Sequence, residues 1–243
     1  MSPPPLHIPS VILSPMSDPV TGRRGGGRRW HLLGCAWRTV RYAGVFGGLW
    51  ALGSEWWFDF RRGTETWWPA GGTQEGDGVP YQGVSPAVFR DAMGAVPKSI
   101  QEGVFVDLGC GKGRALILAA EAGFRRLVGV DLDPALIRVC RRNMRKVRAR
   151  NGWPSVEVEV MDALQFRCSP GKSVVFLYNP FRGETLRQVA MNLAEQGARE
   201  GNQVWVVYVN PVELGMHFKT GFRLEKEGWV RGRRVWAVLR CGG

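Results

Sequence analysis

The segment Val104-Phe105-Val106-Asp107-Leu108-Gly109-Cys110-Gly111-Lys112-Gly113-Arg114 constrains the fold more than any other part of the sequence. Its first five residues predict a short buried strand, the three alternating glycines predict a tight turn, and the apolar residues after Arg114 predict a helix. Glycines at such a turn let backbone N–H groups approach a ligand, because no Cβ atom stands in the way. The segment therefore predicts an α/β fold with a ligand-binding loop after a buried strand.

The same alternation of strands and helices continues along the rest of the chain. Apolar periodicity predicts helices over 84–96, 114–122, 134–151 and 184–196, and strands over 104–108, 126–131, 156–160, 173–179, 203–210, 221–230 and 233–241. The last two strands are separated by Arg231-Gly232, a spacing typical of an antiparallel hairpin. The sequence thus predicts a doubly wound, mainly parallel, seven-stranded sheet with a C-terminal antiparallel hairpin and an N-terminal appendage. Ligands bind such sheets at the carboxyl ends of the strands.

The glycine loop does not match two common phosphate-binding patterns. A dinucleotide site needs G-x-G-x-x-G, but Arg114 stands where the third Gly or Ala belongs. A P-loop built on Gly171-Lys172-Ser173 would have Phe166 in place of its first glycine, and the segment leads into a strand instead of a helix. NAD, FAD and P-loop nucleotides are therefore disfavoured as ligands.

The spacing D-x-G-x-G-x-G, made by Asp107, Gly109, Gly111 and Gly113, resembles the first motif of the class I S-adenosylmethionine (SAM)-dependent methyltransferases. The resemblance covers about residues 81 to 240. It implies that SAM is the cofactor and that the loop binds it. It also implies that Asp107 orders the loop and binds the methionine ammonium.

Two further acids follow the next strands at positions that match this family. Asp131 ends the second strand, eighteen residues after Gly113, and the resemblance implies that it accepts hydrogen bonds from both ribose hydroxyls. Asp162, with Ala163 beside it, follows the third strand and is implied to bind the adenine amine. Carboxylates suit SAM, which presents hydroxyl, amine and ammonium donors. Each acid alone could be a helix cap or a turn residue, but their joint placement favours SAM binding.

The fourth strand leads into Asn179-Pro180-Phe181, where methyltransferases place a substrate-facing motif. Enzymes that methylate planar amino groups often carry [DNS]-P-P-[YFW] there, with an amide or acid that accepts the target N–H and a ring that stacks on the target. This sequence is one proline short, so the Phe181 ring need not reach the same place. The three residues are the predicted catalytic residues, and the alternative is that Asn179 and Phe181 only line the pocket.

A second resemblance concerns the segment Glu55 to Thr66 and the following Pro80-Tyr81-Gln82. The segment is similar to the region before the catalytic domain in a bacterial group of methyltransferases. That group is distantly similar to seven-strand protein lysine methyltransferases, in which an N-terminal segment closes over SAM. The analogy implies that Thr64, Thr66 and Tyr81 touch the methionine end of the cofactor. A segment that only caps the open end of the sheet is the alternative.

The charge is strongly basic, with 33 Lys and Arg against 21 Asp and Glu and a net charge of +12. The helix predicted after the second strand carries seven basic residues between Arg138 and Arg150 and no acid. Such a stripe can attract nucleic acid or an acidic protein. A solvated helix face is the simpler interpretation.

Before the methyltransferase domain, predicted over 84–243, two segments differ in composition. Residues 1–29 are rich in Pro, Arg and Gly and predict a disordered tail. Residues 30–83 are rich in Trp and predict a helical and loop cap, of which 30–62 could contact a membrane surface. The thirteen uncharged residues between Arg41 and Glu55 would make a helix of about 20 Å, too short for a bilayer core of about 30 Å.

The remaining residue types suggest neither a metal centre nor a disulfide framework. The five cysteines show no C-x-x-C spacing, and we interpret them as reduced thiols of a cytoplasmic protein. The three histidines do not follow predicted strands, so no metal site is expected. The sequence predicts a SAM-dependent methyltransferase whose acceptor is unidentified, with a protein side-chain nitrogen favoured by the resemblance. The alternatives are an RNA or DNA base methyltransferase and a noncatalytic SAM-binding module at a membrane.

Overall fold

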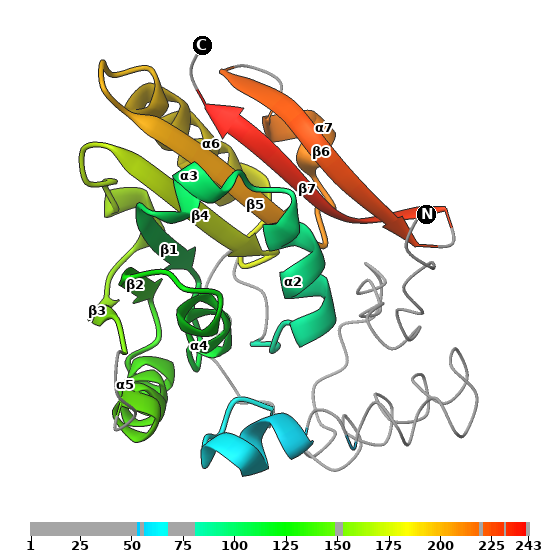
Figure 1. Ribbon diagram of the computed structural model, residues 1–243. Helices are drawn as coiled ribbons and strands as arrows, with labels where there is room; N and C mark the ends of the chain where they lie inside the picture. The colour runs from blue at the N-terminus through cyan, green and yellow to red at the C-terminus, as the bar shows by residue number, and fades with distance from the viewer. Residues whose placement is uncertain are drawn as a thin grey trace, which may run out of the picture. The chain divides into compact units, whose positions relative to one another are not determined.

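The computed structural model describes residues 53, 56–67, 81–148, 153–218, 221–230 and 232–241. The chain divides into two units, Met1–Phe60 and Arg61–Gly243. The predicted tail over 1–29 and most of the predicted cap over 30–83 lie outside the described residues. The sheet, whose strands are labelled in Figure 1, and the glycine loop belong to the second unit.

The described strands form one mixed sheet, as the alternating pattern predicted. They are β1 (Val104–Leu108), β2 (Arg126–Asp131), β3 (Ser155–Val160), β4 (Lys172–Tyr178), β5 (Gln203–Val209), β6 (Phe222–Val230) and β7 (Arg233–Cys241). Their order across the sheet is β3-β2-β1-β4-β5-β7-β6. The pairs from β3 to β5 are parallel, and β7 is antiparallel to both β5 and β6. The predicted seven-stranded, mainly parallel sheet with a C-terminal hairpin is therefore confirmed.

Helices cover both faces of the sheet (Figure 1). The helices are α2 (Pro86–Gly94), α3 (Lys98–Gln101), α4 (Arg114–Glu121), α5 (Pro134–Arg148), the 3-10 helix η2 (Ala163–Gln165), α6 (Gly183–Gly197) and α7 (Leu214–His217). Helices α2, α4 and α5 lie on one face and α6 lies on the other (Figure 1). Strand order reverses between β1 and β4, and a doubly wound fold binds its ligands at the carboxyl ends of strands at such a point.

Strand β1 is buried on both faces, which explains its unbroken apolar sequence. On the face covered by α2 and α4, the Phe105 ring packs among the rings of Phe89, Phe124 and Phe176, with centroids 5.2–5.9 Å apart. On the opposite face, Val104, Val106 and Leu108 belong to the core that α6 covers. This two-sided burial fixes the position at which β1 ends and the glycine loop begins.

The main difference from the predicted elements lies before β1. A single helix was predicted over 84–96, but α2 begins at Pro86, after Ser85, whose hydroxyl accepts the Ala87 N–H at 3.3 Å. The short helix α3, which was not predicted, follows Pro97. Proline disfavours helical geometry in the residue before it, so Pro97 separates the two helices.

Candidate functional site

The glycine loop turns sharply between β1 and α4, and its three glycines have positive φ angles. The values are 80° at Gly109, 51° at Gly111 and 82° at Gly113, in the region that glycine adopts without strain. Close neighbours add a second requirement, because a Cβ atom at Gly109 would overlap Pro180 and one at Gly111 would overlap the Tyr81 ring. The loop therefore needs glycine for its backbone conformation and for its packing.

Asp131, at the end of β2, holds the loop in place. Its Oδ2 accepts the Gly111 N–H at 2.8 Å, and its Oδ1 accepts the Asp133 N–H at 2.9 Å. Burial raises the pKa of this carboxyl, while the backbone N–H bonds act in the opposite direction. Each carboxylate oxygen can accept more than one hydrogen bond, so Asp131 can order the loop and still accept bonds from a ligand.

Asp107 is a buried acid in β1, directly before the loop, with 4% of its surface exposed. Burial, and then the charge of Asp131, raise its pKa from 3.8 to about 8. A buried carboxyl beside a second acid gains most from a cation, because a positive charge would stabilise the ionised form. The predicted contact with an ammonium group suits this environment.

Asp162 and Ala163 lie just beyond β3, at the start of η2. One oxygen of Asp162, Oδ1, accepts the Leu164 N–H at 2.9 Å and so begins the helix. The Asp162 side chain is half-buried. Ala163 is also half-buried and packs against the core on the α6 face. The helix-cap interpretation of Asp162 and the ligand-binding one are compatible, since a carboxylate has several acceptor sites.

Asn179-Pro180-Phe181 follows β4 and contacts the glycine loop through Pro180. Asn179 is 5% exposed and has a φ of 44°, in the left-handed region that asparagine tolerates better than most residues. The Tyr208 hydroxyl lies 3.5 Å from its Oδ1. The Phe181 ring is buried in the core on the α6 face. Asn179 and Pro180 thus lie beside the loop, whereas the Phe181 ring packs in the core.

A second Asn-Pro turn, which the sequence reasoning missed, follows the neighbouring strand β5. Asn210 has a φ of 52°, accepts the Arg233 guanidinium at 2.9 Å, and precedes Pro211. Because β4 and β5 are adjacent and parallel, both turns stand at the carboxyl end of the sheet. The repeated Asn-Pro after two apolar strands is the signal that could have revealed it.

Residues 61–67, here called the strap, bond to α5 and to Tyr81, whose ring packs against Gly111 of the glycine loop. The Tyr81 hydroxyl donates to the Thr66 carbonyl oxygen at 2.7 Å, and the Lys112 ammonium lies 5.5 Å from the centre of the Tyr81 ring. Thr66 is fully buried and Thr64 is 7% exposed. Of the predicted site residues, Tyr81 therefore lies against the glycine loop and Thr66 is bonded to Tyr81, while Thr64 is buried in the strap.

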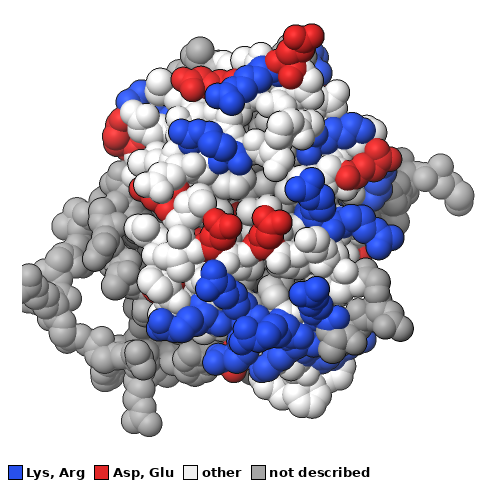
Figure 2. Space-filling view, turned by 90° about the vertical axis from the view of Figure 1, so that its left-hand side faces the viewer, with Lys and Arg blue, Asp and Glu red and all other residues white. Residues whose placement is uncertain are grey.

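Helix α5 presents a basic face, seen in the lower part of the view in Figure 2. Its exposed basic residues are Arg138, Arg141, Arg142, Arg145, Lys146 and Arg148. Part of this charge has partners within the fold. Arg142 and Lys146 lie 2.8 and 4.0 Å from the Glu65 carboxylate, and Arg141 donates to the Val158 carbonyl. The face is thus both a solvated helix surface and the docking site of the strap.

Two other predictions concern thiols and metals. Cys110, in the glycine loop, is buried, and its hydrogen bond with Cys140 together with burial raises the pKa of its thiol. A protonated, buried thiol is a poor nucleophile, so a packing role fits its surroundings. Over the described ranges, no group of three or more His, Cys, Asp or Glu side chains could hold a metal ion.

Comparison with known proteins identifies the domain. Residues 105–197 match the model of a protein family described as a methyltransferase domain. The chain contains a class I, SAM-dependent methyltransferase domain. A relative of this methyltransferase domain, the ribosomal protein L11 methyltransferase of Burkholderia multivorans, is 28% identical over 166 residues. The match covers 63% of this chain and 50% of that protein. The corresponding protein of Burkholderia cenocepacia is 27% identical over the same length.

Solved structures show the same fold. The protein yhhF of Escherichia coli, assigned to the methyltransferases, has a TM-score of 0.51 and 17% identity, over 65% of this chain and 88% of that one. The Pyrococcus horikoshii protein PH1948, assigned to the RNA methyltransferases, has a TM-score of 0.50 and 14% identity, over 76% of this chain and 95% of that one. The methyltransferase domain thus shares its fold with these two proteins.

The methyltransferase domain has the features that SAM requires. The glycine loop is a cradle that side chains at its glycines would fill. Asp131 bonds to the loop backbone, and Asp107 lies in β1 just before the loop. Asp162 follows β3, which runs parallel to β2, so it stands at the same end of the sheet. SAM offers hydroxyl, amine and ammonium donors, which carboxylates accept. The described residues therefore fit this cofactor.

Proposed function

We propose that this protein transfers a methyl group from SAM to a nitrogen atom of a protein side chain. The observation that carries the proposal is the buried Asn179, which has a left-handed conformation and precedes Pro180, the residue that packs against Gly109 of the glycine loop. The similarity to methyltransferases named for ribosomal protein L11 supports a protein acceptor. The chain spans about half the length of those relatives, so their named acceptor is not carried over to this chain and the protein acceptor is proposed here.

Three carboxyl groups would hold the cofactor at three points. Asp107 would pair with the methionine ammonium, Asp131 would accept from the ribose hydroxyls, and Asp162 would accept from the adenine amine. When bound, SAM supplies a methyl group made electrophilic by its attachment to a positively charged sulfur. The glycine loop would lie against the methionine end through Gly109, Gly111 and the N–H groups between them.

Asn179 would orient the acceptor nitrogen. Its side-chain oxygen can accept an N–H of the acceptor, which directs the nitrogen lone pair toward the methyl carbon. Positioning alone can account for a large part of the rate enhancement in such a transfer. No dedicated base is required if the acceptor enters the site uncharged.

The burial of Phe181 favours a protein side chain over a planar base. A base acceptor would gain from an aromatic ring stacked on its face, but the Phe181 ring is 8% exposed and belongs to the core. The exposed arginines of α5 support the alternative, an RNA or DNA acceptor, since they could bind phosphates.

Transfer of tritiated methyl groups from SAM into fractionated protein, RNA, DNA and small-molecule pools tests the proposal. We expect label in the protein fraction, lost with Asn179→Ala while SAM affinity stays near that of the wild type. Label in RNA or DNA would favour the alternative acceptor. Failure of the wild type to label any fraction, together with intact SAM binding, would favour a noncatalytic module.

Peripheral membrane contact through 30–62 and a cytoplasmic location stay proposals. Trp56, Trp57 and Phe60 are more than half exposed, and the Phe60 ring stacks on both tryptophan rings. Among the described helices, none is long and apolar enough to cross a bilayer. Co-sedimentation of liposomes with the full chain and with a chain lacking residues 1–62 tests the contact, and equal binding would exclude it.

A further inference from the structure

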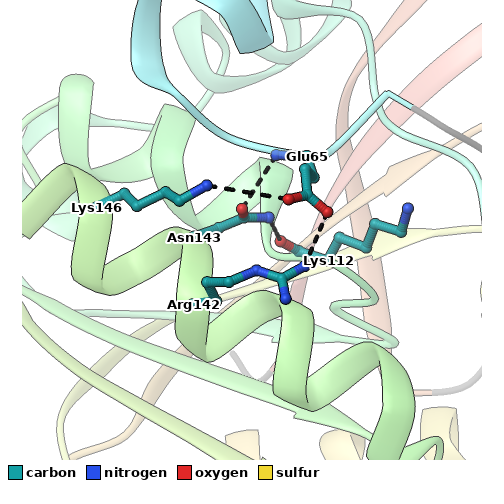
Figure 3. Close-up of polar contacts among 5 residues, drawn as sticks. All are labelled: Glu65, Lys112, Arg142, Asn143 and Lys146. Atoms are coloured by element: carbon teal, nitrogen blue, oxygen red, sulfur yellow. Dashed lines mark hydrogen bonds and ion pairs between the residues drawn. The ribbon is translucent and has the colours of Figure 1, made fainter.

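Asn143 is a fully buried polar side chain in the middle of the basic helix α5. A buried amide is destabilising unless its donor and acceptor groups are hydrogen-bonded. Both ends of this amide have partners from outside α5. Its Nδ2 donates to the Lys112 carbonyl oxygen at 3.0 Å, and its Oδ1 accepts the Glu65 N–H at 3.0 Å (Figure 3).

These two bonds join the strap to the glycine loop. Lys112 lies between Gly111 and Gly113, so a bond to its carbonyl fixes the peptide planes that aim the loop N–H groups. The Glu65 N–H belongs to the strap, 78 residues away in sequence. Asn143 therefore bridges two backbone segments that are far apart in the sequence.

Other contacts hold the strap against the same region. Arg62 donates twice to the Glu121 carboxylate, at 2.8 Å each, at the end of α4. The Glu65 side chain pairs with Arg142 and Lys146 on α5 (Figure 3). The pairs of Glu65 with Arg142 and Lys146 are about half exposed, so each contributes little to stability. The Arg62–Glu121 pair is bidentate and less exposed. Breaking the amide bridge would leave a buried polar group without a partner, which is costly.

We propose that Asn143 is a positioning residue that couples the docking of the strap to the cofactor-binding conformation of the glycine loop. The proposal rests on the proposed SAM site. With the bridge intact, the strap and the loop hold each other in place, and cofactor binding protects both. Without the bridge, the loop samples other conformations. The apparent association constant for the cofactor is then multiplied by the fraction of molecules whose loop keeps the binding conformation.

Asn143→Asp separates the two bonds of the bridge. The aspartate keeps an oxygen that accepts the Glu65 N–H, but it loses the donor to Lys112 and places a carboxylate against that carbonyl. We expect the affinity for S-adenosylhomocysteine, measured calorimetrically, to fall about tenfold. A tenfold change corresponds to about 1.4 kcal/mol, which lies within the free-energy cost of leaving a buried polar group without a hydrogen bond. Hydrogen exchange of peptides covering 61–67 and 109–113 should become faster.

Asn202→Asp is a control with the same hydrogen-bond pattern at a half-buried position. Asn202 makes the same pair of bonds, donating from Nδ2 to the Gln196 carbonyl at 2.8 Å and accepting the Gly171 N–H at 3.0 Å. Gly171 and Asn202 precede β4 and β5, so this bridge lies at the end of the sheet opposite the glycine loop. This variant should lower the melting temperature but leave the affinity within about twofold of wild type.

The outcomes distinguish this inference from the proposed function. If wild-type protein does not bind S-adenosylhomocysteine, the proposed cofactor site is wrong. If the wild type binds and Asn143→Asp binds equally well, or the two variants lose affinity in parallel with their melting temperatures, the coupling is refuted. If Asn143→Asp does not fold, hydrogen exchange of the wild type with and without S-adenosylhomocysteine tests the coupling. The coupling requires that the ligand slow exchange in residues 61–67. Unchanged exchange there would also refute the coupling.

Discussion

Replacement of Asp107 by asparagine should remove most of the pH dependence of cofactor binding. Burial and the neighbouring Asp131 raise the pKa of Asp107 to about 8, so at pH 7 about ten molecules carry the protonated acid for each that carries the carboxylate. The proposed ammonium contact requires the carboxylate. Binding to the wild type at pH 7 should therefore release about 0.9 protons to the buffer.

The affinity should follow the fraction of ionised Asp107. Between pH 5.5 and 7 this fraction rises about tenfold for each pH unit, equivalent to about 1.4 kcal/mol of binding free energy. The ammonium of the ligand stays largely charged in this range, since α-amino groups titrate near pH 7.7–8.0. Asparagine at position 107 does not titrate, so the variant should bind with weak and nearly constant affinity.

Stability of the free protein gives an independent readout. The folded-state pKa of Asp107 is raised above its ordinary value of 3.8, so the folded protein binds more protons than the unfolded chain between about pH 4 and pH 8. The contribution of Asp107 to stability therefore falls as pH rises through this window. In the Asp107→Asn variant, the free energy of unfolding should not show this decrease with rising pH.

Titration calorimetry with S-adenosylhomocysteine, in two buffers of different ionisation enthalpy, measures the released protons. The same titrations in Asp107→Asn subtract any proton that the ligand or another group contributes. Equal heats in both buffers for the wild type at pH 7, or a pH profile that the variant retains in full, would refute the reasoning.

Three further predictions test the loop, the core and the basic face. Gly111→Ala should lower the melting temperature and the affinity for S-adenosylhomocysteine more than Gly171→Ala, because both positions have positive φ but only at Gly111 does a Cβ overlap a ring; equal losses would contradict the packing argument. Ile117→Ala removes a fully buried side chain and should lower the free energy of unfolding by about 2–5 kcal/mol in urea titrations, whereas a loss below 1 kcal/mol would not fit its burial. If RNA binds α5, raising salt from 50 to 200 mM should weaken binding steeply, less so in the Arg138→Ala, Arg145→Ala double variant; salt-independent binding would exclude this surface.

The sheet could be predicted because its strands are short, apolar and separated by regular helices. Because a strand such as β1 is buried on both faces, nearly all of its residues are apolar, and this apolar run is easily recognised in the sequence. Asp107 and Asp131 stand out for the same reason, since an acid near the end of an otherwise apolar strand is conspicuous in the sequence.

Contacts between distant segments could not be predicted in the same way. Asn143 stands within a run of basic residues, and the periodicity of α5 alone does not indicate that its amide bonds to Lys112 and to Glu65. Phe181 belongs to a motif whose ring is expected to stack on a planar acceptor, yet the ring is buried in the core on the α6 face. The partners of Asn143 and the burial of Phe181 depend on contacts between segments that are far apart in the chain, and local sequence patterns do not indicate such contacts.

The position of β7 in the sheet has a consequence for the order of assembly. Strand β7 follows β6 in sequence but lies between β5 and β6, and pairs with both. During synthesis, β5 therefore keeps one edge without its partner, and β6 has no place in the sheet, until residues 233–241 have left the ribosome. The parallel half, with the glycine loop and Asp131, needs none of these residues for its strand pairing. The cofactor half of the sheet can thus form first, and the hairpin closes the exposed edge of β5 as the last step.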